Sequence, residues 1–151
     1  MRFALVWVLF LVACTAVPAA DPKPVKIKKV LVHLLDRDGK HFLSPSLYER
    51  DAYQAHLRQN RAEQGGLRFD IHWNSRTART VTLQVELRGA NDQKSTESRL
   101  SKLVVLSQSG SRWTDLRTEG EAYRQFGQLA AWRVTVWDGE LLLAEQRSFL
   151  W

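Results

Sequence analysis

Cysteine is nearly absent from this chain of 151 residues, in which Cys14 is the only one. The rest of the chain cannot form an internal disulfide, so its hydrophobic core must hold it together. Proline and glycine are also scarce, with four and eight residues. These counts exclude collagen-like and low-complexity sequence. The remaining composition, 44% hydrophobic and 25% charged, is typical of one globular domain.

Long apolar runs are missing apart from residues 3–14, which follow the single cation Arg2 and precede small residues and Pro18. This run is shorter than the roughly 20 residues of a membrane-spanning helix. Its layout is typical of a secretory leader. We therefore expect a signal peptide over residues 1–20, a linker over residues 21–24, and an exported domain over residues 25–151 in the periplasm or on the cell surface.

Two kinds of leader fit these residues. The small residues 17–19 allow ordinary cleavage after Ala19 or Ala20, which would release a soluble domain. Alternatively, residues 11–14, Leu-Val-Ala-Cys, resemble the lipobox of bacterial lipoproteins. That resemblance implies lipidation of Cys14 and a domain anchored to a membrane. The sequence leaves both alternatives open.

Acidic residues are outnumbered by basic ones, 16 to 22, which gives a net charge of +6. Four lysines, Lys23, Lys26, Lys28 and Lys29, gather at the start of the predicted domain. They could meet an anionic membrane surface, but lysines on an edge strand also block aggregation between sheets, and we favour this second interpretation. Nucleic acid is not expected as a partner of an exported protein that carries no RNA-binding motif.

Helical patterning is scarce, and alternation of apolar and polar residues dominates, as in Leu67, Phe69, Ile71 and Trp73. This pattern predicts an all-β fold, an antiparallel immunoglobulin-like β-sandwich of six to seven strands. We expect the strands at residues 25–35, 67–73, 79–88, 103–107, 113–116, 130–137 and 140–151. The glycines at 65–66 should break the chain, and the polar residues 89–101 should form a surface loop.

One short helix is predicted over residues 47–58, across one end of the fold. Ser46 and Glu49 have the spacing of a capping box. Tyr48, Ala52 and Ala55 share the face that should pack inward. A further helical turn or corner is expected over residues 118–126, with Tyr123 and Phe126 facing inward.

Asp138 and Gly139 between two apolar runs predict a tight hairpin turn that pairs Trp137 with Glu140. Glu145 and Arg147 would then point inward, so we expect either a sheet edge there or a bulge near Gln146. The inner face should comprise Trp132, Val134, Val136, Leu141 and Leu143. We expect Trp151 to lie in the final strand and to pack into the core.

Residue patterns that carry chemistry are also few. The four histidines, His33, His41, His56 and His72, have no metal-binding spacing, and no nucleophile or phosphate-binding motif is present. We therefore expect neither a metal nor a cofactor. The chain is not predicted to be an enzyme, and a small envelope hydrolase is the least favoured alternative.

Tryptophan is the one residue type in excess, with six. The alternation of inward and outward positions assigns Trp73, Trp132 and Trp151 to the core. Trp113 and Trp137, with the neighbouring Arg133, remain as candidates for ligand binding. The preferred hypothesis is a non-catalytic interaction or accessory module of the bacterial cell envelope, whose partner is an unknown protein or envelope polysaccharide. The alternative is a carbohydrate-binding module that uses the surface tryptophans.

Overall fold

The computed structural model describes residues 24–91 and 94–151. The expected leader, Cys14 and Lys23 lie outside these residues. The structure contains seven strands and two short α-helices, with a single 3-10 turn at Arg61–Glu63. The strands are β1 (Val25–Asp36), β2 (Gln64–Ser75), β3 (Arg79–Asn91), β4 (Lys94–Leu106), β5 (Gly110–Glu119), β6 (Gln128–Asp138) and β7 (Leu141–Arg147). The helices are α1 (Leu47–Gln59) and α2 (Gly120–Phe126).

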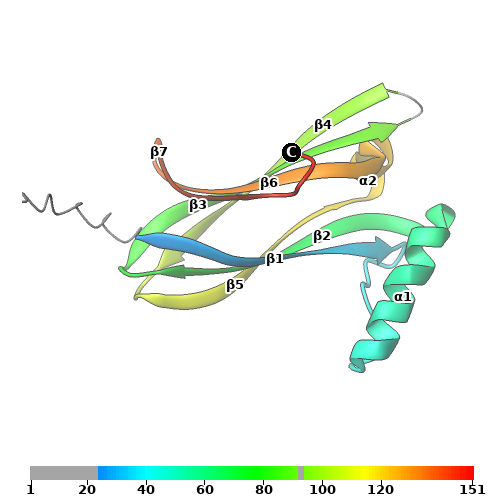
Figure 1. Ribbon diagram of the computed structural model, residues 1–151, viewed down its shortest axis with the longest axis horizontal. Coiled ribbons are helices and arrows are strands. Elements are labelled where there is room, and N and C mark those ends of the chain that lie inside the picture. Colours follow the sequence, from blue (N-terminus) through cyan, green and yellow to red (C-terminus); the bar gives the residue numbers. More distant parts are fainter. Residues whose placement is uncertain (1–23, 92–93) are drawn as a thin grey trace, which may run out of the picture.

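The strands form two antiparallel sheets, which confirms the predicted all-β class. One sheet has three strands in the order β1-β2-β5, and the other has four in the order β4-β3-β6-β7. The two sheets pack face to face, and α1 lies at one end of the molecule (Figure 1). Consecutive strands β2 and β3 therefore belong to different sheets, so the turn between them crosses from one layer to the other.

The core lies between the sheets and follows the alternation seen in the sequence. Phe69, Ile71 and Trp73 of β2 face inward and are completely buried. From β3, Leu83 and Val85 meet them with no exposed surface. Burial of side chains of this size contributes roughly 1.5–3 kcal/mol each to stability, so the two central strands hold the layers together.

One buried polar group of this core is the indole N–H of Trp73, which has a partner. The indole Nε1 of Trp73 donates a hydrogen bond of 3.0 Å to Oγ1 of Thr114 on the neighbouring strand β5. Both residues are buried. An unpaired indole N–H in the core would cost about 1–3 kcal/mol of stability. The Thr114 hydroxyl avoids this cost by accepting the hydrogen bond from Trp73.

The polar segment 89–101 is not the surface loop that we predicted. Residues 89–91 end β3, and Lys94–Leu106 form the long strand β4, which pairs with β3 along its whole length. β4 lies at the edge of the four-stranded sheet, and most of its residues are exposed. An edge strand with one solvated face does not need apolar residues, so its polar composition was misleading.

The glycine pair at 65–66, where we expected the chain to break, also lies within a strand, because both glycines belong to β2.

The hairpin between β6 and β7 exists, but its register differs from the prediction. Asp138 pairs with Leu141, so the two turn residues are Gly139 and Glu140. A bulge follows, because the next pairs are Trp137 with Leu142 and then Val136 with Ala144. Leu143 is the extra residue, three positions before the place where a bulge was expected. Leu143 is buried in the core, as expected, but Leu141 beside the turn is 64% exposed and does not pack into the core.

Trp151 does not lie in a strand or in the core. β7 ends at Arg147, and Ser148 still bonds to Trp132 through two hydrogen bonds. The chain then turns away, and the Trp151 ring lies partly buried against the guanidinium groups of Arg88 and Arg133. Stacking on two cations, and not packing into the core, shields this indole from water.

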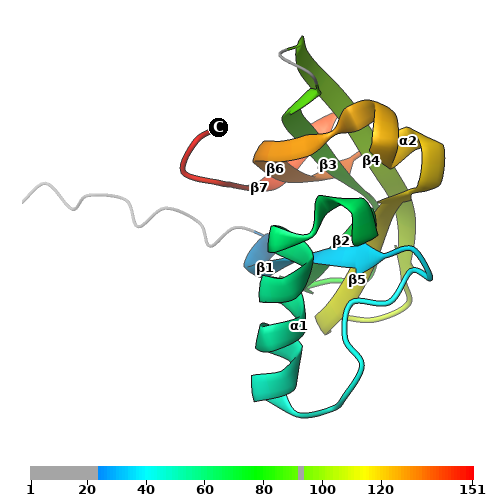
Figure 2. The same ribbon diagram turned by 90° about the vertical axis from the view of Figure 1, so that its right-hand side faces the viewer.

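Helix α2 confirms the corner that we predicted at 118–126, because Tyr123 and Phe126 are buried there. Helix α1 begins after Ser46, but the Ser46 side chain makes no capping hydrogen bond. Figure 2 shows α1 extending away from the sheets. The prediction that Tyr48 belongs to the inward face of α1 is wrong, because Tyr48 is 83% exposed. The buried residues of this helix are Gln54 and Leu57.

Candidate functional site

The three predicted ligand-binding residues lie on two opposite surfaces of the molecule. Trp113 is on the outer face of the three-stranded sheet, opposite His72 in the register. Trp137 and Arg133 are on the outer face of the four-stranded sheet, four residues apart on β6. The structure therefore brings Trp137 and Arg133 to one surface and separates both from Trp113.

Trp113 forms a flat aromatic surface with His72. The two rings are stacked, with centroids 4.8 Å apart and planes inclined by 12°. The indole remains 53% exposed. Beside it, Ser111 accepts hydrogen bonds from Lys28 at 2.8 Å and from Asn74 at 3.1 Å. An exposed ring stacked on a neighbouring imidazole, with polar groups alongside, can stack on the apolar face of a planar or sugar-like ligand.

A second surface on the four-stranded sheet is apolar, and sequence reasoning missed most of it. Leu103 pairs with Thr82, Thr82 with Trp137, and Trp137 with Leu142, so these residues form one row across all four strands. Val105, two residues after Leu103 on β4, lies on the same face beside the row. We call Leu103, Val105, Trp137 and Leu142 the apolar patch.

The apolar patch is largely open to solvent. Leu103, Val105 and Leu142 are 67%, 69% and 43% exposed. Trp137 is partly buried, and its Nε1 donates to Thr135 Oγ1 at 2.8 Å, which leaves only its apolar surface for contact. The parity of Leu103 and Val105, which pair with the outward residues Thr82 and Thr80, is the signal that could have revealed this surface.

Arg133 is engaged within the protein. Its guanidinium is hydrogen-bonded and ion-paired to Glu86 on β3, and Trp151 stacks against it, with Cζ 5.2 Å from the ring centroid. Arg99 on β4 binds the same carboxylate at 2.7 Å. Burial raises the pKa of Glu86, but the hydrogen bonds from Arg133 and Arg99 outweigh it and hold that pKa below its usual value. These contacts stabilise the sheet and occupy Arg133.

Two histidines and an aspartate gather on the outer face of the three-stranded sheet, close to α1. The rings of His33 and His41 are 5.1 Å apart, and His33 Nε2 lies 3.6 Å from Asp70. Arg68 binds Asp70 at 2.7 Å. Burial is the main cause that lowers the pKa of His41 to about 4, and the charge of Arg68 lowers it further. The His41 imidazole is therefore neutral at physiological pH, and burial also lowers the pKa of His33.

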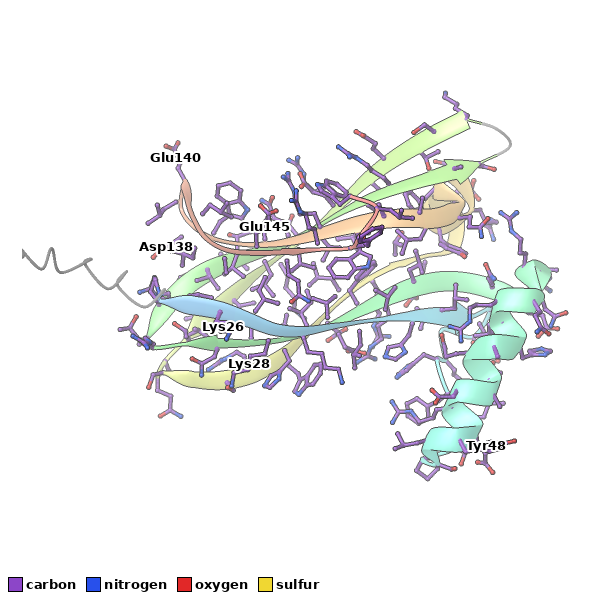
Figure 3. All side chains as sticks on the ribbon, in the orientation of Figure 1. Lys26, Lys28, Tyr48, Asp138, Glu140 and Glu145 are labelled. Atoms are coloured by element: carbon purple, nitrogen blue, oxygen red, sulfur yellow. The ribbon has the colours of Figure 1, made fainter. Side chains whose placement is uncertain are left out.

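Of the four clustered lysines, Lys26, Lys28 and Lys29 belong to β1. Figure 3 shows Lys26 and Lys28 toward the end of the molecule opposite α1, where Asp138 and Glu140 flank the tip of the hairpin between β6 and β7. Lys26 and Lys28 line a cavity of about 590 Å³ together with Glu145 of β7. Basic and acidic side chains thus share this end of the fold, and its charge is mixed.

Within residues 24–91 and 94–151, no helix is long and apolar enough to cross a membrane. The same residues hold no group of three or more histidine, aspartate or glutamate side chains placed to bind a metal ion. No family model, no curated protein and no solved structure matches this chain.

Proposed function

We propose that the protein is an exported, non-catalytic, immunoglobulin-like interaction module of the bacterial cell envelope, and that it binds a partner protein through the apolar patch. The observation that carries this proposal is the row Leu103, Trp137 and Leu142, which lies on the outer face of a sheet whose other face is already packed. Apolar groups gathered on one surface gain free energy when a partner covers them.

The strand order supports the immunoglobulin-like part of the proposal. In that architecture, strands A, B and E share one sheet and C, F and G share the other, with C′ added beside C in some members. The orders β1-β2-β5 and β4-β3-β6-β7 agree with this arrangement, if the seven strands correspond in sequence to A, B, C, C′, E, F and G.

Export rests on the leader-like residues 1–20 and on the lipobox resemblance at residues 11–14. Mass spectrometry of the mature protein, expressed in a bacterial host, tests both. Cleavage after Ala19 or Ala20 supports a soluble exported form, and a lipidated Cys14 at the new amino terminus supports an anchored form. An unprocessed chain that stays in the cytoplasm would contradict export.

A photo-crosslinking side chain tests the apolar patch. We expect the group placed at Val105, an exposed residue of the apolar patch on the edge strand β4, to give a discrete adduct with a protein of the envelope. The matched control is Arg117, an exposed position on the outer face of the other sheet. Equal adducts at both positions, or none at Val105, would contradict the proposal, as would turnover of substrates in a broad hydrolase panel.

The stacked pair Trp113 and His72 supports a second candidate function, binding of an envelope polysaccharide. Trp113→Ala should then abolish retention on an insoluble polysaccharide. Trp137→Ala, on the opposite surface, is the control and should leave retention unchanged. If neither substitution alters retention, or the unmodified protein is not retained, this second candidate is rejected.

A further inference from the structure

A cavity of about 380 Å³ opens between the two sheets beside the carboxyl-terminal half of α1. Its lining comes from both sheets and both helices. The lining residues are Val32, Leu34, Gln54, Arg58, Arg61, Gln64, Leu67, Tyr123, Gln128 and Leu129. The cavity is distant along β6 from the apolar patch, which lies at the other end of that strand.

The cavity exists because β7 covers only part of β6. β7 pairs with β6 from Arg133 to Asp138, and the chain leaves the sheet after its bonds between Ser148 and Trp132. The first residues of β6, including Leu129, therefore have no strand neighbour on that side. In the facing sheet, β1 continues to Asp36. The space between these two uncovered edges is the mouth of the cavity.

One part of the cavity wall is apolar. Val32, Leu34 and Leu129 pack against the hydrophobic core but remain partly exposed, and all three line the cavity. Leu67 lies behind them and is 3% exposed. Apolar surface that reaches the core yet still meets solvent gains free energy when an apolar ligand covers it.

Three polar side chains of the wall, Gln54, Gln64 and Tyr123, bond to the protein itself. Tyr123 donates to Gln64 Oε1 at 2.7 Å, and Gln64 Nε2 donates to the Leu57 carbonyl at 2.6 Å. Gln54 bonds to both backbone groups of Leu34. These groups keep their partners when a ligand enters, so an apolar chain could fill the cavity without leaving them unpaired.

Two arginines lie at the mouth. Arg58 and Arg61 line the cavity, and both are exposed. Neither makes an ion pair with another residue in the part of the chain that the structure describes. A pair of guanidinium groups beside an apolar cavity complements a ligand with an anionic head and an apolar tail.

We propose that this cavity binds an anionic amphiphile, an acyl chain with a carboxylate head. The chain would lie against Val32, Leu34 and Leu129, and Arg58 and Arg61 would bind the carboxylate. The volume falls within the roughly 300–1,000 Å³ of small-molecule sites, near the lower limit, which favours a chain of medium length. This inference does not depend on the apolar patch or on its partner.

Calorimetric titration of the mature protein with decanoate tests the proposal, with 1-decanol as an uncharged probe of equal length. We expect saturable decanoate binding below its micelle concentration. Arg58→Gln with Arg61→Gln should weaken decanoate binding about tenfold or more, since two charge-assisted contacts are lost, and should leave 1-decanol binding unchanged. The control, Arg76→Gln with Lys26→Gln, removes the same charge at the opposite end.

Leu129→Trp should fill the cavity and abolish binding of both probes, while urea unfolding verifies that the variant still folds. The proposal is overturned if decanoate does not bind, if the control pair weakens it as much as the arginine pair, or if Leu129→Trp has no effect. A failure of this kind would leave the crosslinking result at Val105 untouched, so the two proposals fail separately.

Discussion

Gln54 of α1 forms hydrogen bonds with both backbone groups of Leu34 on the edge strand β1. Its Oε1 accepts from the Leu34 N–H at 2.9 Å, and its Nε2 donates to the Leu34 carbonyl at 2.9 Å. The same Nε2 also donates to the His41 carbonyl at 2.8 Å. One side-chain amide thus takes the place of a neighbouring strand and attaches the helix to the sheet.

Replacement of Gln54 by Leu should destabilise the protein by about 2 kcal/mol or more, because backbone groups of Leu34 lose their partner in a partly buried site. Urea denaturation measures the change in the free energy of unfolding. Gln59→Leu, an exposed position on the same helix, is the control and should change stability little. Equal losses in the two variants would show that the amide does not hold α1.

Gly127 ends α2 with a φ of +82°, and a Cβ there would lie 2.4 Å from the Ala90 carbonyl oxygen. Gly127→Ala should therefore destabilise the protein by more than the roughly 1–3 kcal/mol of backbone strain alone. Gly139 has a similar positive φ of +57° but open space around it. Thermal unfolding of Gly127→Ala and Gly139→Ala separates the clash from the strain, and equal effects would contradict the clash.

Trp151 lies against Arg88, whose Cζ is 4.1 Å from the ring centroid. Trp151→Ala should lower the free energy of unfolding by about 1 kcal/mol, since both the cation–π contact and the ring packing are lost. A double-mutant cycle with Arg88→Gln measures the coupling between the two side chains. A coupling energy near zero would mean that the ring and the guanidinium are adjacent without stabilising each other.

The pKa of His41 predicts how stability depends on pH. Its folded pKa of about 4 lies below the ordinary value of 6.5, so between these values the unfolded chain binds more protons. Stability should therefore fall as the pH drops from about 6.5 to 4. Burial also lowers the pKa of the neighbouring His33, which acts in the same direction.

Urea denaturation at several pH values between 7.5 and 4 measures this loss. His41→Asn should flatten the pH dependence in that window, because the substituted side chain does not titrate. His33→Asn should flatten it as well. An unchanged pH profile in both variants would show that these imidazoles are not the groups responsible.

The alternation of apolar and polar residues predicted the central strands correctly. These strands bury one face against the opposite sheet, so every second residue must be apolar. β2 and β3 follow period two without interruption, and their inward residues are those that the sequence indicates. The first part of β4, residues 94–102, escaped prediction because an edge strand exposes most of its side chains, whereas its end was expected as a strand at 103–107. Its pairing depends on the backbone of β3, which the polar residues 94–102 do not reveal.

The candidate sites were predicted less well. The parity of Trp113 and Trp137 placed both outside the core, but sequence reasoning could not tell that they lie on opposite surfaces. The apolar patch depends on the pairing of β4, β3, β6 and β7 in one sheet, which brings Leu103, Trp137 and Leu142 into one row. The cavity at Leu129 depends on where β7 ends, and no local pattern marks that position.

The amino-acid sequence by itself determined the fold class, because burial of one face imposes period-two alternation on each strand wherever it lies. Only the tertiary structure decided which strands share a sheet, which edge stays uncovered, and that Gln54 contacts the sheet in place of the apolar face expected for α1. These features depend on contacts between residues far apart in the chain, whose energies the local pattern does not encode.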